Sequence, residues 1–246
     1  MVREFFRRLK EGTEQLNYGR DIIARWAAEK FAHTDTPLSI LDLGCGHGDD
    51  LVNVRNHLAG KKIRLYGIES FPENVRDSAR AGIEVANIDL ERSIYPFSDG
   101  TIDLIIANQI IEHTKEIFWI LSESSRILRH DGFMIVGVPN LASLHNRILL
   151  LFGDQPSSIE LLGPHVRGIT VSSFRRFVEA DGIFHLDDVR GSNFYPFPSS
   201  LSTPLSKLFP RLAVSLFFLI RKVHPTKRFI EVLNTRTFET NFYTGR

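Results

Sequence analysis

Short apolar runs alternate with helical patterns over most of the chain. Leu38 to Leu43 and Ile63 to Ile68 are mostly apolar, and Ile102 to Ala107 is almost wholly apolar. Runs of this length are typical of buried strands, and a run with almost no polar position is typical of a parallel strand that is covered on both faces. Two more short runs predict strands over Glu84 to Ile88 and Phe133 to Val138.

Helical spacing fills the stretches between these runs. Apolar residues recur at helical intervals from Ile22 to Phe31, with charged residues between them, which predicts an amphipathic helix that ends near His33 and Pro37. A second helix is predicted from Ile117 to Leu128, with its end at Asp131-Gly132. Strand and helix alternate in this way over about 120 residues, the pattern of a parallel sheet with helices on both faces. Ligands of such sheets bind beyond the carboxyl ends of the strands.

The second half of the chain is less regular. Glycines and prolines interrupt residues 141–170, which we interpret as an insertion. A further helix is predicted to end at Gly182, followed by a strand over Ile183 to Val189. A Pro/Ser-rich connection then runs from Tyr195 to Pro204, and Ala213 to Ile220 reads as a last strand.

Composition places the chain among ordinary globular proteins. It has 246 residues, of which 43% are hydrophobic and 24% are charged, as expected for one domain of generous size. Thirty Lys and Arg residues against 29 Asp and Glu give a formal net charge of +1. So small a net charge provides no overall field that would hold a polyanion, and a nucleic-acid partner is not implied.

Cysteine usage and the absence of apolar segments indicate the compartment. A single cysteine cannot form an intramolecular disulfide or a thiolate-rich zinc site, so we expect a reducing setting and no bound metal. The first twenty residues are charged throughout and lack the apolar core of an export signal. The longest apolar stretch, Leu212 to Ile220, is too short to span a bilayer. The expected location is the cytoplasm.

A glycine-rich turn carries the strongest chemical signal. The strand that ends at Leu43 runs directly into Gly44-Cys45-Gly46-His47-Gly48, where glycines let a ligand approach the backbone before the next helix begins. A dinucleotide fingerprint needs a third glycine at the position of Asp49. Because a carboxylate there repels phosphate, the turn suits a ligand that carries positive charge. A tight turn without a ligand is the alternative.

Glu69 ends the second predicted strand, 21 positions after Gly48. A carboxylate at this place can accept hydrogen bonds from both hydroxyls of a ribose. A nicotinamide cofactor also has such a ribose, so an NAD-dependent oxidoreductase stays open as an alternative.

Together these stretches resemble the class I S-adenosylmethionine-dependent methyltransferases, and among them the broad small-molecule group of type 11. The first motif runs from Leu41 to Asp49, and the match covers roughly residues 20–222. It continues in order through Tyr66 to Glu69, Ala86 to Leu90, Pro96 to Ile105, Asn108 to His113 and Leu128 to Phe133. The chain departs from the group at His130-Asp131, where similar proteins usually have Pro-Gly.

The resemblance implies a fold and a domain division. The fold is α/β, with a doubly wound, mostly parallel seven-stranded sheet of Rossmann-like type, helices on both faces and a last antiparallel strand. The methyltransferase domain would span residues 1–222, with an N-terminal helical part over 1–36 and an acceptor lid over 141–170. The tail over 223–246 remains unassigned.

It also implies S-adenosyl-L-methionine as the cofactor and a set of residues around it. The glycine turn would pass along the methionine part, Glu69 would hold the ribose hydroxyls, and Asp89 with the Leu90 backbone would meet the adenine amino group. The predicted cofactor-binding residues are Asp42, Gly44, Cys45, Gly46, Gly48, Glu69, Asp89, Leu90, Asn108 and Gln109. Cys45 is expected to be a buried packing thiol without a reactive role.

No catalytic residue is assigned by these motifs. The sulfonium is already an activated methyl donor, so a general base is needed only for a hydroxyl acceptor of high pKa. His113 and His165 are candidates for that base, with packing or helix capping as the alternative for His113. Arg167 is either a contact for an anionic acceptor or a brace within the lid, and Arg20 either reaches the cofactor carboxylate or lies on a solvated helix face.

The predicted function is methyl transfer to a small-molecule, lipid or sugar acceptor. A non-catalytic regulator or scaffold that binds the cofactor is the alternative from a different class. The apolar stretch Leu208 to Ile220 has basic neighbours, so Phe209, Phe217 and Phe218 would meet lipid if this stretch contacted a membrane. The competing interpretation places Ala213 to Ile220 in the sheet. No oligomeric state follows from the motifs.

Overall fold

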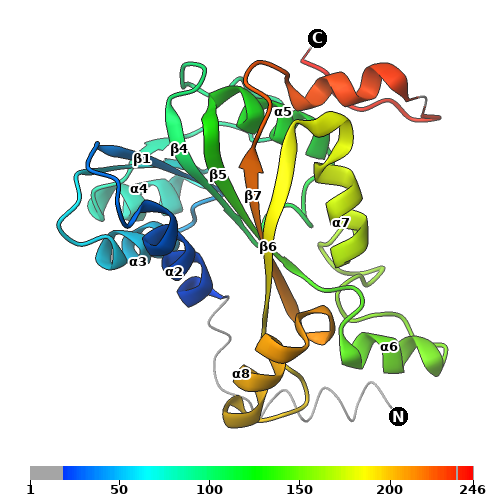
Figure 1. Cartoon of the computed structure of the whole chain (residues 1–246). Coiled ribbons are helices and arrows are strands. Elements are labelled where there is room, and N and C mark those ends of the chain that lie inside the picture. Colours follow the sequence, from blue (N-terminus) through cyan, green and yellow to red (C-terminus); the bar gives the residue numbers. More distant parts are fainter. Residues whose placement is uncertain (1–18, 237, 246) are drawn as a thin grey trace.

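The computed structural model describes residues 19–236 and 238–245, which form a central sheet with helices around it (Figure 1). The strands are β1 (Leu38–Leu43), β2 (Ile63–Ile68), β3 (Glu84–Ala86), β4 (Ile102–Asn108), β5 (Leu128–Pro139), β6 (Phe184–Ser192) and β7 (Ser215–Lys222). Their order is β3-β2-β1-β4-β5-β7-β6. The first five strands pair in parallel, and β7 is antiparallel to both of its neighbours.

Helices cover both faces of the sheet. They are α2 (Arg20–Phe31), α3 (Asp49–His57), α4 (Pro72–Arg80), α5 (Ile117–Ile127), α6 (Leu144–Leu151), α7 (Val171–Val178) and α8 (Ser199–Leu208), with short 3-10 turns η1 (Ala180–Gly182), η2 (Pro210–Leu212) and η3 (Phe229–Thr235). Helices α6 and α8 lie beyond the carboxyl ends of β5 and β6, at the lower end of the view in Figure 1.

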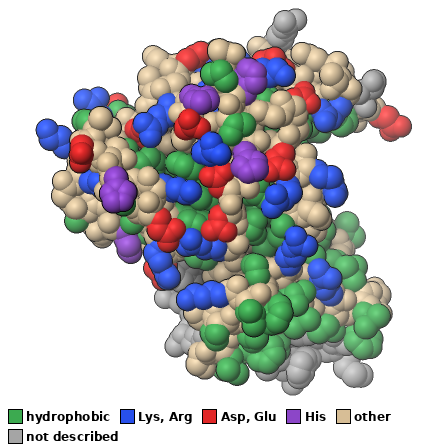
Figure 2. Space-filling model, viewed as in Figure 1, with side chains coloured by type: hydrophobic (Ala, Val, Ile, Leu, Met, Phe, Trp, Pro, Cys, Tyr) green, Lys and Arg blue, Asp and Glu red, His purple; other side chains and the backbone are tan. Residues whose placement is uncertain are grey.

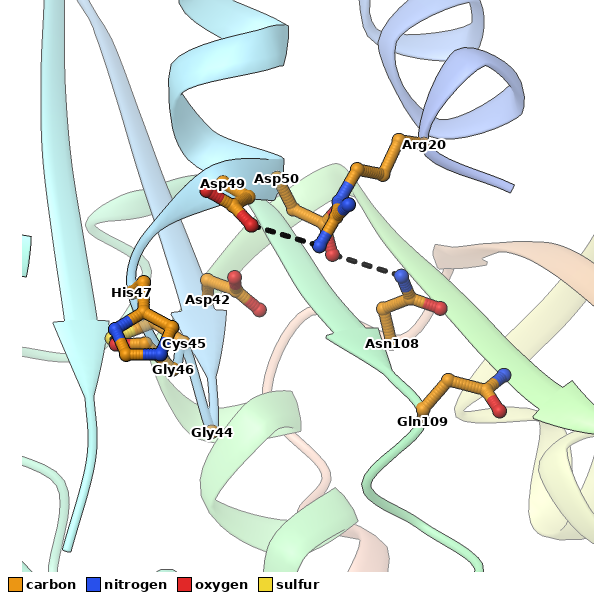
Figure 3. A pocket seen from close by; sticks show the side chains of 10 residues that line it. All are labelled: Arg20, Asp42, Gly44, Cys45, Gly46, His47, Asp49, Asp50, Asn108 and Gln109. Atoms are coloured by element: carbon orange, nitrogen blue, oxygen red, sulfur yellow. Dashed lines mark hydrogen bonds and ion pairs between the residues drawn. The ribbon is translucent and has the colours of Figure 1, made fainter. Parts of the chain in front are cut away.

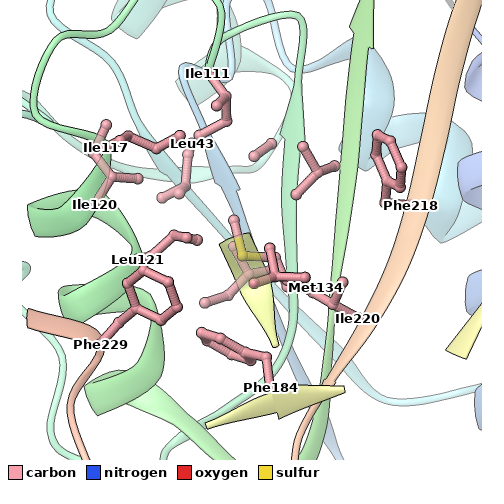
Figure 4. Packing of buried hydrophobic residues seen from close by; sticks show 14 of the residues in the cluster. Leu43, Ile111, Ile117, Ile120, Leu121, Met134, Phe184, Phe218, Ile220 and Phe229 are labelled. Carbon is pink, nitrogen blue, oxygen red and sulfur yellow. The ribbon is translucent and has the colours of Figure 1, made fainter. Parts of the chain in front are cut away.

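Alternation along each strand divides the core into two layers. In β1, Leu38 and Ile40 pack with the α2 and α3 side of the sheet, whereas Leu41 and Leu43 pack with the α5 and α7 side. This is the period of two that a strand covered on both faces requires. Figure 4 shows the second layer, in which Leu43 and Met134 from the sheet meet α5 and the buried ring of Phe229.

The predicted fold class is confirmed, including the antiparallel last strand. One predicted boundary is wrong: α5 ends at Ile127 and the chain enters β5 at once, so Asp131-Gly132 lies inside that strand. Asp131 has a φ of 60° there, and the β4–β5 register shifts nearby. Asp131-Gly132 therefore marks an irregular turn within β5 and not the end of a helix.

The segments after β5 contain more helix than the sequence indicated. The predicted insertion over 141–170 includes α6, and the Pro/Ser-rich connection continues into α8, which has Pro204 inside it. Of the predicted N-terminal helical part, residues 1–18 lie outside the described residues, and α2 forms the remainder. In the tail, Phe229 is buried and its backbone N–H donates to Ser125 Oγ on α5 (2.9 Å).

The membrane interpretation of Leu208 to Ile220 is not supported at its two central residues. Phe217 and Phe218 are each 0% exposed because they belong to β7 and point into the two core layers. The alternative, which places Ala213 to Ile220 in the sheet, is therefore correct from Ser215 onward, whereas Phe209 precedes the strand and is 48% exposed. None of the helices in the described part of the chain is long and apolar enough to cross a membrane.

Candidate cofactor and acceptor sites

The glycine turn follows β1 at the carboxyl edge of the sheet. Gly44, Gly46 and Gly48 all have positive φ, a conformation that favours glycine. A Cβ on Gly44 would lie 2.8 Å from Ile110, and one on Gly48 would lie 2.2 Å from Ile83, so packing requires these two glycines. A Cβ on Gly46 would meet nothing within 4 Å. Gly46 therefore faces open space that a ligand can occupy.

A pocket of about 240 Å³ lies beside this turn. Figure 3 shows Asp42 from β1, Asp50 from α3 and Asn108 from the end of β4 converging on it. Its lining residues are Arg20, Asp42, Gly44, Cys45, Gly46, His47, Asp49, Asp50, Asn108 and Gln109. The sheet topology makes the pocket, because β1 and β4 are neighbours and end at the same edge.

Buried carboxylates dominate the electrostatics of the pocket. Burial raises the pKa of Asp42 well above its ordinary value, and the nearby charges of Asp50 and Glu69 raise it further. Burial likewise raises the pKa of Asp50. Arg20 lies 2.9 Å from Asp49 and 3.4 Å from Asp50, so it offsets part of this negative charge. The remaining charge would be relieved by a cationic ligand, which favours the charged form of both acids.

Glu69 closes the turn through backbone hydrogen bonds. Its Oε2 accepts from Gly46 N (2.9 Å), and its Oε1 accepts from the N–H groups of Ser70 and Phe71 (2.8 Å each). It is 7% exposed and does not line the pocket. Since an ionised carboxylate has about four acceptor sites, it can still accept from a ligand hydroxyl.

Gln109, which follows β4, has a backbone conformation that is unusual for a residue other than glycine. It has a φ of 55°, its backbone N–H donates to Gly137 O (2.8 Å), and its side-chain Nε2 is buried without a hydrogen-bond partner among the described residues. A non-glycine residue held in this conformation costs about 1–3 kcal/mol and is often found at ligand sites. The side-chain amide is therefore a donor available to a ligand.

Cys45 lines the pocket as a packing residue. Burial raises the pKa of its thiol to about 12, so the thiol stays protonated at neutral pH. A Cβ on Gly67 of β2 would lie 2.5 Å from the sulfur. This agrees with the expectation of a buried, unreactive thiol.

The other predicted cofactor residues lie outside the lining. Gly48 caps α3, and the side chain of Asp89 accepts from Glu91 N (2.8 Å) in the segment after β3. Leu90 lies next to it and is half-buried against the core. The pocket lining thus brings together Asp42, Gly44, Cys45, Gly46, Asn108 and Gln109, whereas Gly48, Glu69, Asp89 and Leu90 lie outside it.

A second group of residues forms where the loop after β4 meets the predicted lid. Val166 N donates to Glu112 O (2.8 Å), and Arg167 Nη2 donates to the carbonyls of Thr114 and Lys115 (2.8 and 2.9 Å). The rings of His113 and His165 lie edge to face with centroids 4.6 Å apart. The two candidate bases, distant in sequence, are therefore neighbours.

Glu112 lies beside these histidines and is buried. Burial raises the pKa of its carboxyl to about 7, and neither carboxylate oxygen has a hydrogen-bond partner within the described residues. Burial lowers the pKa of His113, and His165 lowers it further. Sequence reasoning missed Glu112 and Asp50 as site residues. The available signals were the Glu-His pair after a buried strand and the second aspartate at the start of a helix.

Comparison with known proteins identifies the family. The family model described as methionine biosynthesis protein MetW matches residues 34–179, which is more than half of the chain. The chain belongs to the MetW family. The match extends from just before β1 to the end of α7, so it includes the glycine turn, the pocket, and the Glu112 and His165 segments.

Curated relatives of this MetW family chain include a bifunctional protein and a probable methyltransferase. The bifunctional methionine biosynthesis protein MetXA/MetW of Rhodopirellula baltica is 33% identical over 109 residues, which are 42% of this chain and 17% of that protein. A probable S-adenosylmethionine-dependent methyltransferase of Mycolicibacterium smegmatis is 29% identical over 66% of this chain and 58% of its own length. The chain thus spans less than two thirds of these relatives.

Solved structures share the fold. A putative methyltransferase solved in complex with the Trm112 activator of Haloferax volcanii has a TM-score of 0.55 at 18% identity, covering 85% of this chain and 99% of that chain. A SAM-dependent methyltransferase from Archaeoglobus fulgidus has a TM-score of 0.53 at 13% identity, over 82% and 94% of the two chains. The predicted resemblance to class I methyltransferases is confirmed, and these comparisons imply S-adenosyl-L-methionine as the cofactor.

Proposed function

We propose that the protein transfers a methyl group from S-adenosyl-L-methionine to a small-molecule, lipid or sugar acceptor. The observation that carries the proposal is the acid-lined pocket beside Gly46, at the edge where β1 and β4 end. S-adenosylmethionine has a sulfonium and an ammonium group, and both suit a pocket in which Asp42 and Asp50 are buried together. A dinucleotide has the opposite charge and fits poorly.

Each part of the cofactor has a partner on this edge. The methionine part would pass along Gly44 to Gly46, with Asp42 near its amino group, and Glu69 would hold the ribose hydroxyls. Asp89 and the Leu90 backbone would meet the adenine, and Gln109 Nε2 would donate to the methionine portion. Gly48 shapes the start of α3 and makes no contact of its own in this proposal.

The chemistry asks mainly for alignment. The bound cofactor supplies an activated methyl group on a sulfonium sulfur, and the protein holds the acceptor in line with the methyl–sulfur bond while excluding water. The lid residues 163–168 are docked on the loop after β4 through Val166 and Arg167. Arg167 therefore acts as a brace, the second of the two roles expected for it.

Exposed apolar residues favour an acceptor with an apolar part. Leu151 at the end of α6 is 81% exposed and Leu161 in the lid is 91% exposed. Figure 2 shows hydrophobic side chains gathered over the end of the molecule where α6 and α8 lie. Because large exposed apolar patches often mark ligand or membrane contacts, we propose that the acceptor reaches the site from a lipid surface or carries an apolar chain.

A non-catalytic role is the second candidate. The name of the Rhodopirellula relative describes one protein that unites MetXA with MetW, which favours a cofactor-binding module that serves an attached or separate partner. A structural neighbour titled as a [4+2]-cyclase, SpnF, with a TM-score of 0.56, also shows that this fold accommodates other activities. The two candidates differ in turnover and not in cofactor binding.

The test is methyl incorporation from labelled S-adenosylmethionine into extracted small-molecule, lipid and sugar fractions. Gly46→Arg should abolish it, because the side chain fills the open space beside the turn. Gly60→Arg is the matched control, since Gly60 also has positive φ and open space but lies outside the pocket. Incorporation that is equal in both variants would contradict the proposal. Cofactor binding without incorporation into any fraction would favour the non-catalytic role.

A further inference from the structure

Glu112, His113 and His165 gather their ligand-type atoms in one place. One atom from each residue lies within 4.8 Å of the others, although His165 is far from the other two along the chain. Glu112 Oε1 and His113 Nε2 are 4.0 Å apart. One carboxylate and two imidazoles are a donor set that binds divalent transition metals such as Zn²⁺ and Fe²⁺.

Glu112 is the observation that points to a ligand. Its side chain is 2% exposed, and both of its oxygens lack a hydrogen-bond partner among the described residues. Buried carboxylates are normally hydrogen-bonded, paired with a cation or bound to a metal, because an unpaired one is costly. Glu69, at the same edge, is satisfied in the usual way, because its carboxylate accepts hydrogen bonds from three backbone N–H groups. Nothing comparable is aimed at Glu112 within the described part of the chain.

His165 is held in the form that a metal ligand needs. Its Nδ1 lies 2.8 Å from Ser158 O, and a carbonyl can only accept, so Nδ1 carries the proton. In the neutral ring Nε2 then has its lone pair free. Metal-binding histidines nearly always donate their other ring N–H to a carbonyl or carboxylate in this manner.

The backbone fixes the two segments against each other. Val166 N donates to Glu112 O, and Arg167 donates to the carbonyls of Thr114 and Lys115. A metal with bonds of about 2.0–2.2 Å holds its ligand atoms roughly 3–4 Å apart. The ligand atoms, now up to 4.8 Å apart, would therefore have to approach one another by about 1 Å when a metal binds. Rotation of the His113 side chain can supply this movement, because it is 36% exposed and the most accessible of the three.

We infer that Glu112, His113 and His165 bind one divalent transition-metal ion between the loop after β4 and the lid. This departs from the expectation of no metal, which rested on the single cysteine. The ion would leave coordination positions open for water or an acceptor oxygen, and a bound hydroxyl would lose its proton more readily. That last role rests on the proposed methyl transfer, whereas ion binding does not.

The experiment measures Zn²⁺ binding to the untagged, chelator-stripped full chain by calorimetry, with Co²⁺ absorption as the report on coordination. We expect one ion per chain. Glu112→Gln and His165→Gln should each weaken binding at least about 10-fold, the loss that follows even when an outer-shell partner of a metal ligand is removed. Glu112→Gln keeps the shape of the side chain and removes an unpaired buried charge, so it should fold.

The matched control is His185→Ala, which removes a histidine that faces a carboxylate elsewhere (His185 Nδ1 to Glu179 Oε1, 3.3 Å). It should bind Zn²⁺ like the wild type. Absence of stoichiometric binding, or equal binding by wild type and Glu112→Gln, would overturn the inference. S-adenosylhomocysteine binding is measured on the same samples, so that loss of cofactor binding is recognised separately as a failure of the proposed function.

Discussion

Two buried glutamates at one edge of the sheet have opposite environments. Glu69 accepts three backbone hydrogen bonds and ties the glycine turn to the end of β2. Glu112, after β4, has no hydrogen-bond partner for its carboxylate within the described residues, and burial raises its pKa to about 7. The Glu69 carboxylate is thus satisfied by the protein itself, whereas the Glu112 carboxylate is not.

Because the two carboxylates differ in this way, replacing each glutamate with glutamine should change the free energy of unfolding in opposite directions. Glu69→Gln places an amide NH₂ against backbone donors and should lower the free energy of unfolding by about 1–3 kcal/mol. Glu112→Gln removes a buried charge, and in chelator-treated protein it should raise the free energy of unfolding at pH 8 by about 3 kcal/mol, from 1.36 kcal/mol per pKa unit between 4.5 and about 7. Urea unfolding measures both.

The sign at Glu112 follows from proton linkage. The folded protein holds this proton more tightly than the unfolded chain, so stability falls as pH rises from about 4.5 to about 7. The gain from Glu112→Gln should therefore shrink to less than about 1 kcal/mol at pH 5. A gain that is equal at pH 5 and pH 8 would show that Glu112 is not the titrating group.

A substitution of Asp42 should change the stability of the free protein and its affinity for the cofactor in opposite directions. The pKa of Asp42 is raised by burial and by neighbouring acids, so Asp42→Asn should raise the melting temperature of the free protein at pH 8. The same change should weaken S-adenosylhomocysteine binding by roughly 10-fold, since a charged hydrogen bond to the ligand ammonium is lost. Lower stability together with unchanged affinity would contradict the role given to this residue.

Arg167 should have the smallest effect. Arg167→Ala removes hydrogen bonds to the carbonyls of Thr114 and Lys115 and should cost about 1 kcal/mol of stability. Cofactor affinity should stay within about 2-fold, because the residue braces the lid and does not line the pocket. Arg211→Ala, on the exposed turn η2, is the control. A large loss of cofactor affinity in Arg167→Ala alone would place Arg167 in the cofactor site.

The same contrast explains what the sequence could predict. The turn from Gly44 to Gly48 lies within one strand–turn–helix unit, and Glu69 ends the next strand, so local patterns and the parallel topology sufficed to group them. The proximity of His165 to Glu112 and His113 depends on how the irregular segment over residues 141–170 docks on the loop after β4. The spacing of apolar and polar residues along the sequence does not specify how these two segments pack together. The cluster of Glu112, His113 and His165 could therefore be found only in the structure.

The central claim is that this edge binds S-adenosylmethionine through the glycine turn and Glu69. Calorimetry of S-adenosylhomocysteine against ligand-free wild type, Glu69→Ala and the exposed control Glu73→Ala tests it directly. We predict wild-type affinity for Glu73→Ala and a loss of about 1.5–3 kcal/mol for Glu69→Ala, as expected for hydrogen bonds to a charged group. No binding by the wild type, or equal binding by all three proteins, would contradict the account.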